Sequence, residues 1–145
     1  EHYSHKKEGA KLAWGESWPT IFGNLVTKYY GDELNGIMYI NDDYYDAPNS
    51  SDKRWGYNLE HDELGLKYGG YCERDIMFVL FDLFDDNEDE DFDKIAVGHY
   101  GLWQLVINSG AYTMSDFTSF VQNQTYVEVD WTAFKSICKE YGVSL

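Results

Sequence analysis

The sequence predicts a mainly α-helical domain of about five packed helices, with only a minor contribution from strands. Apolar residues recur at the spacing of one helical face in five separate stretches of the chain. Hydrophobic residues make up 43% of the chain and aromatic residues 18%, which is enough to build a core. Since 145 residues fit one domain and no long linker divides them, residues 1–145 are predicted to fold as a single domain. The first residue is not Met, and we expect the chain to be a piece of a longer protein.

The first helix is predicted from about Trp18 to Tyr30, with Pro19 in its first turn and Gly31 at its end. Its apolar face consists of Trp18, Ile21, Phe22, Leu25, Val26 and Tyr29. Residues 32–70 are rich in Asn, Asp, Gly and Tyr, and they predict a long irregular excursion. Short strand-like pieces at Ile37–Ile40 and Trp55–Leu59 leave room for one small hairpin within it.

Four further helices are predicted in the second half of the chain. The helix from about Tyr71 to Phe84 is apolar on nearly all sides, so we expect it to be central. The next is predicted from about Asp93 to Asn108. A short helix should follow Thr113, which with Asp116 resembles a capping box. The last is predicted to begin at Asp130 as N-cap and to run to Tyr141, with Gly142 as its terminator.

The charge and the cysteines limit the possible functions. A formal net charge of −15 repels phosphate backbones and anionic lipids, so we expect no nucleic-acid partner. No apolar run reaches the roughly 20 residues that cross a bilayer, so membrane insertion is not expected. Cys72 and Cys138 both fall on inward helix faces, which is compatible with a disulfide or with two buried thiols.

The first residues of the chain contain candidate zinc ligands. His2 and His5 are three residues apart and Glu1 and His5 are four apart, a spacing that places both on one face of a helix. A third ligand, Glu16, could join them if Gly9 turns the chain. One continuous helix could not do this, because eleven residues rise about 16 Å. The alternative is a frayed terminus with solvent-exposed histidines.

Several segments together resemble a known enzyme family. Glu1-His2-Tyr3-Ser4-His5 and Ala13-Trp14-Gly15-Glu16-Ser17-Trp18 are similar to the His-Glu-x-x-His helix and the later Glu-bearing helix of gluzincin-type zinc metallopeptidases. The stretch 73–85, which contains Val-Leu-Phe-Asp-Leu-Phe-Asp, resembles a later helix of a bacterial and archaeal group in that family, and segments 98–103 and 115–117 are also similar. The order differs at the first motif, which reads Glu-His-x-x-His here.

This resemblance implies a zinc-dependent peptidase, or an incomplete or inactive relative of one, that acts on a peptide or protein substrate. His5 and Glu16 would be zinc ligands, and Glu1 or His2 would stand in for the missing ligand and the general base. A metal-bound water hydrolyses a peptide bond only where the metal has an open coordination position and a base lies beside the water.

Glu73 and His99 are further candidates, because each falls within the apolar stripe of its predicted helix. Two inward-pointing polar side chains need partners, so they either pair with each other or line one buried site. A structural hydrogen bond between helices competes with a role beside a metal, such as transition-state stabilisation. Glu16, in contrast, lies opposite the Trp18 stripe and reaches a site only if another layer packs on that face.

The acidic stretch 85–93 is a candidate calcium site. Read as an EF-hand from Asp85, it supplies Asn87 and Asp89 as ligands, but Glu90 and Ala96 occupy the positions of the required Gly and Glu. It is therefore either a solvated loop or an irregular Ca²⁺ site. The competing function is accordingly a non-catalytic extracellular or cell-surface module that binds Ca²⁺ or a protein partner.

Overall fold

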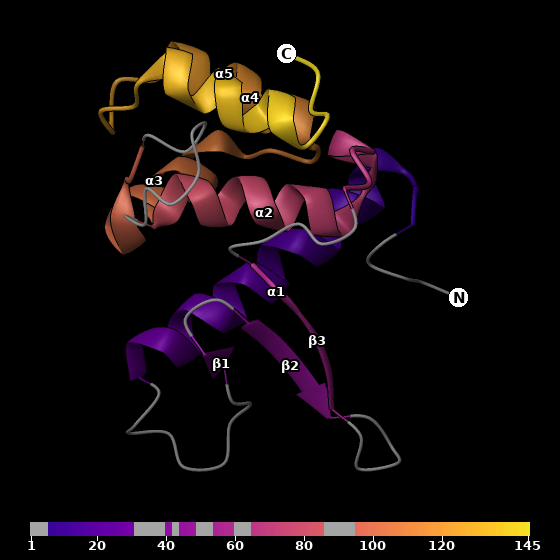
Figure 1. Cartoon of the computed structure of the whole chain (residues 1–145). Helices are drawn as coiled ribbons and strands as arrows, with labels where there is room; N and C mark the ends of the chain where they lie inside the picture. Colours follow the sequence, from indigo (N-terminus) through magenta and orange to yellow (C-terminus); the bar gives the residue numbers. More distant parts are fainter. Residues whose placement is uncertain (1–5, 31–39, 42–43, 49–53, 60–64, 86–94) are drawn as a thin grey trace.

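The computed structural model describes residues 6–30, 40–41, 44–48, 54–59, 65–85 and 95–145. Helices dominate these ranges, as predicted, and Figure 1 shows them stacked in layers with a small sheet beside the first helix. The elements in chain order are α1 (Ala10–Tyr30), β1 (Ile40–Asn41), β2 (Tyr44–Pro48), β3 (Arg54–Asn58), the 3₁₀ turn η1 (Gly69–Tyr71), α2 (Glu73–Phe84), α3 (Gly98–Ser109), α4 (Met114–Asn123) and α5 (Trp131–Glu140).

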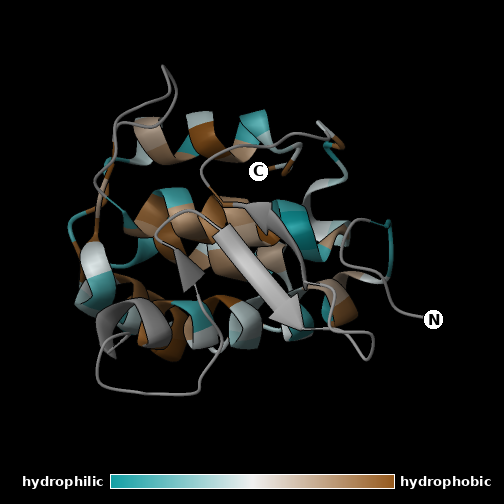
Figure 2. Cartoon of the chain, turned by 60° about the horizontal axis from the view of Figure 1, so that its bottom comes forward, coloured by the Kyte–Doolittle hydropathy of each residue, from teal (hydrophilic) through white to brown (hydrophobic). Residues whose placement is uncertain are grey.

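Helix α2 is the centre of the molecule, as its sequence predicts. All of its residues are buried, and it contacts α1, α3 and α5. Figure 1 shows it between α1 on one side and the α4–α5 layer on the other. Figure 2 shows that hydrophobic ribbon is concentrated in this central layer. The ring of Phe78 in α2 stacks on Tyr141 with centroids 5.2 Å apart, which joins the central helix to the C-terminal segment.

Helix α1 begins at Ala10, eight residues before the predicted start at Trp18, and Pro19 lies inside it. The earlier turns form because Ala13 and Trp14 are buried and extend the apolar face toward the N-terminus. Pro19 removes one helical hydrogen bond, whose acceptor would be the carbonyl of the exposed residue Gly15. Solvent can satisfy that carbonyl, and so the helix continues. The predicted terminator, Gly31, lies outside the described residues.

The three strands form one antiparallel sheet in the order β1-β2-β3. Strand β3 agrees with the strand-like piece predicted at Trp55–Leu59, and β2 pairs with it as a hairpin in which Tyr45 lies opposite Tyr57. Strand β2 was not predicted. Of the other predicted piece, only Ile40 lies within the described residues, where it begins β1.

Helix α3 begins at Gly98, later than the predicted Asp93. Residues 95–97 are not helical, and the backbone N–H of Val97 donates to the carbonyl of Leu83 at 2.9 Å. This bond holds the chain against the end of α2, and Gly98 then has a positive φ of 66°. A tertiary contact therefore displaces the start of the helix.

The last two helices begin as predicted. Thr113 Oγ1 accepts a hydrogen bond from the N–H of Asp116 at 3.1 Å, and the Asp116 carboxylate accepts one from Tyr112 N–H at 3.2 Å. Asp130 Oδ1 accepts from the N–H groups of Thr132 and Ala133 at 2.8 and 3.1 Å. Within the described ranges, no helix is both long and apolar enough to cross a bilayer.

Candidate functional site

The structure describes four of the predicted site residues. These are Glu16, Glu73, Asp85 and His99. The other five lie outside the described residues: Glu1, His2, His5, Asn87 and Asp89.

Glu16 is exposed on α1. Helix α1 begins after Gly9, whose carbonyl accepts from Ala13 N–H at 2.9 Å, and residues 6–9 are not helical. The N–H of Glu8 instead donates to the carbonyl of Tyr71 at 2.7 Å, which holds this segment against η1. The helix carrying Glu16 therefore does not extend back to His5, and the rise of one continuous helix does not separate the two residues.

Glu73 is buried in the first turn of α2, as predicted. Its Oε1 accepts a hydrogen bond from Thr20 Oγ1 at 3.3 Å, and Ser17 Oγ donates to its backbone carbonyl at 3.0 Å. The Thr20 hydroxyl also lies 2.8 Å from the carbonyl oxygen of Glu16, one helical turn earlier. The hydroxyls of α1 therefore hold the start of α2, and they bring the Glu73 carboxylate beside the turn of α1 that carries Glu16.

The prediction that His99 points into the core is wrong, since the side chain is exposed. Its ring packs edge-on against Phe84 with centroids 4.6 Å apart, at the C-terminal end of α2. Glu73 lies at the opposite end of this helix, and eleven residues correspond to about 16 Å, so the two side chains do not pair directly. The cause is the late start of α3, which places His99 in the first turn, while Leu102 and Leu105 supply the buried face.

Asp85 is buried at the C-cap of α2, where its N–H donates to the carbonyl of Phe81 at 3.0 Å. Among the residues that the structure describes, no group of three or more His, Cys, Asp or Glu side chains is placed to hold a metal ion. Asn87 and Asp89, the other two candidate calcium ligands, are outside that set.

No disulfide joins Cys72 and Cys138, and both are buried thiols, which is the second of the two arrangements that the sequence allows. Burial raises the pKa of Cys72 to about 11, and burial raises the pKa of Cys138 to about 12. A thiol with such a pKa is protonated at neutral pH and is a poor nucleophile or metal ligand.

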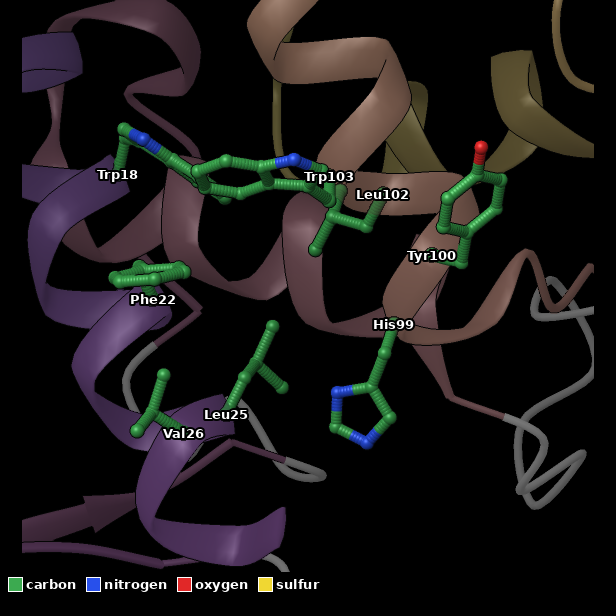
Figure 3. A pocket seen from close by; sticks show the side chains of 8 residues that line it. All are labelled: Trp18, Phe22, Leu25, Val26, His99, Tyr100, Leu102 and Trp103. Carbon is green, nitrogen blue, oxygen red and sulfur yellow. The ribbon is translucent and has the colours of Figure 1, made fainter.

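An apolar pocket of about 350 Å³ lies between α1 and α3. Figure 3 shows the side chains that line it: Trp18, Phe22, Leu25, Val26, His99, Tyr100, Leu102 and Trp103. Three rings form one wall, with centroids 5.6 Å apart for Trp18–Phe22, 5.3 Å for Phe22–Trp103 and 6.2 Å for Trp18–Trp103. Sequence reasoning missed this pocket, because it assigned Trp18, Phe22 and Trp103 to the core.

Comparisons of the chain with protein families, with curated proteins and with solved structures found no match.

Proposed function

We propose that this chain is a zinc metallopeptidase-like domain in which Glu16 is one of the metal ligands. The observation that carries the proposal is the position of Glu16. Its carboxylate is exposed on α1, and the adjoining turn holds the buried carboxylate of Glu73 through Thr20. Carboxylates bind Zn²⁺, and groups that hydrogen-bond around a site orient its ligands.

The surface around Glu16 leaves room for the rest of such a site. A Cβ atom added at Gly15 or Gly23 would meet nothing within 4 Å, and Leu12 is 47% exposed on the same helix. Another layer of protein can therefore approach α1 closely on this side. That approach is the condition under which Glu16 reaches a metal. The family resemblance assigns the remaining ligands to His5 and, with Glu1 as the base, to His2.

Bound zinc would supply a polarised water as the nucleophile for peptide-bond hydrolysis. Glu16 would hold the metal. Glu73 would keep its place beside the site through its hydrogen bond with Thr20. Glu1 is the candidate base that takes the proton from the nucleophile, by the same resemblance.

Elemental analysis of the dialysed protein tests the proposal. We expect about one equivalent of zinc per chain in the unaltered protein, as in sites with three protein ligands. Both His5→Ala and Glu16→Gln should lose it. Glu128→Gln is the matched control, because Glu128 is an exposed glutamate in the segment between α4 and α5. Absence of zinc from the unaltered protein, or zinc retained in both ligand variants, would overturn the proposal.

A second measurement separates an active enzyme from an inactive relative. Hydrolysis of an unstructured protein such as casein should stop in the presence of a chelator and return with added zinc. Glu1→Gln should lose hydrolysis while it keeps the metal. If zinc is bound and no hydrolysis is found, the domain is a metal-binding relative that lacks the activity.

A further inference from the structure

The pocket between α1 and α3 is built for an apolar group. Leu25 and Leu102 are 6% and 1% exposed and form its floor. Its volume of about 350 Å³ is at the lower end of the range of ligand sites. None of its eight lining residues is Asp, Glu, Lys or Arg.

The wall of the pocket is both exposed and held in place. Phe22 and Trp103 are 41% and 39% exposed, and Tyr100 at the rim is 76% exposed. The contacts of Phe22 and Trp103 with each other and with Trp18 fix their rings. Rigid aromatic side chains bury much area at little entropic cost when a partner binds. A contiguous exposed patch of this kind marks an interaction site.

The charge of the chain selects among the possible occupants. The protein carries 26 acidic and 11 basic residues, for a net charge of −15. A second copy of the chain would bring the same charge and be repelled, whereas a basic partner would be attracted. We propose that this pocket binds one large apolar side chain presented by a basic peptide segment. This binding requires no metal and does not depend on the zinc site proposed above.

Three synthetic nonapeptides test the proposal. Their binding is measured in the presence of a chelator by calorimetry and by tryptophan fluorescence, to which Trp18 and Trp103 in the pocket contribute. The first alternates Lys and Gly around one central Phe; the second replaces that Phe with Ala; the third replaces every Lys with Glu. We expect the first to bind about tenfold more tightly than the second, as burial of one aromatic side chain implies. The acidic peptide should bind more weakly than either basic peptide.

Variants of residues in the wall and at the rim of the pocket provide a second test of the proposal. Phe22→Ser should reduce the affinity for the first peptide to that for the second, and Tyr100→Ala should weaken it less. Tyr112→Ala is the matched control for the rim, because Tyr112 is 74% exposed and does not line the pocket. Circular dichroism checks that each variant is folded.

Two results would overturn the inference. Equal affinities for the Phe and Ala peptides would mean that charge alone binds them. Sedimentation that shows a dimer which Phe22→Ser abolishes would assign the pocket to a second copy of this chain.

Discussion

At the scale of single residues, the two thiols link stability to pH. Burial raises the pKa of Cys72 to about 11 and of Cys138 to about 12, above the ordinary value of 9.0. Between pH 9 and 11 the unfolded chain releases these protons while the folded chain keeps them, so the free energy of unfolding must fall as pH rises. Each thiol contributes at most roughly 1.4 kcal/mol per pH unit in that window.

We therefore expect denaturation midpoints to drop between pH 9 and 11, and to drop less in the double variant Cys72→Ala/Cys138→Ala. Every ionisable group other than the two thiols is the same in both proteins, so the difference between the two curves isolates the thiols. Parallel curves would contradict the prediction. At pH 8, a thiol reagent should modify the cysteines only after unfolding.

The N-cap of α5 is a second effect at this scale. Asp130 Oδ1 satisfies two backbone N–H groups that have no partner within the helix. We expect Asp130→Ala to lower the free energy of unfolding by about 1 kcal/mol. Urea denaturation measures this, with Glu128→Ala as the control because Glu128 is exposed and caps no helix. If the two variants lose equal stability, the cap does not contribute.

At the scale of elements, two backbone segments approach closely at glycines. Gly142, which follows α5, has a φ of 73°, and a Cβ atom there would collide with the backbone of Lys67 before η1. Gly110 after α3 has a φ of 56° but open space around it. Gly110→Ala should therefore cost only the strain of a left-handed residue, about 1–2 kcal/mol.

Gly142→Ala should cost clearly more, because Lys67 and η1 must move as well. Thermal denaturation of the two variants tests this, since the strain of positive φ is common to both. Equal losses of stability in the two variants would show that the segments around Gly142 and Lys67 can move apart without a loss of free energy. The salt bridge between Lys67 Nζ and Glu140 Oε1, 2.9 Å long and exposed, contributes little to holding them.

Local sequence signals predicted the centres of the helices better than their starts. Apolar periodicity was sufficient for α2, and short-range capping was sufficient for α4 and α5, because both signals act within a few residues. The starts of α1 and α3 depend on contacts between distant segments. Burial of Trp14 extends α1, and the bond from Val97 to Leu83 delays α3. The apolar pattern of one helix carries no information about either of these contacts.

At the scale of the whole molecule, the candidate site was only partly predictable for the same reason. The inward position of Glu73 followed from helical spacing, since α2 is regular along its length. The position of His99 did not, because spacing gives the face of a residue and not its place along the helix, and His99 lies in the first turn of α3 beside the C-terminal end of α2. The pocket requires α1 and α3 to pack together, and the aromatic residues that line it have the same spacing as core residues.

The net charge of −15 affects the stability of the whole molecule. Different salts can show whether cations stabilise the fold by general screening or by binding at a calcium site. Like charges in one compact fold repel, and salt screens them over about 8 Å at 0.15 M. We therefore expect the melting temperature to rise when NaCl is added, and to rise equally with KCl. CaCl₂ at matched ionic strength provides the decisive comparison.

An irregular site that includes Asp85 and Asp89 would bind Ca²⁺ to the folded state, and so raise the melting temperature beyond the NaCl effect. Asp89→Asn should then remove this additional rise in melting temperature. Asp116 is exposed but is not a suitable control, because it caps α4. Glu128→Gln serves instead. An excess that Asp89→Asn removes, in a protein without zinc, would favour the acidic module over the metallopeptidase-like domain. Equal effects of CaCl₂ and NaCl mean that the acidic stretch acts only through its charge.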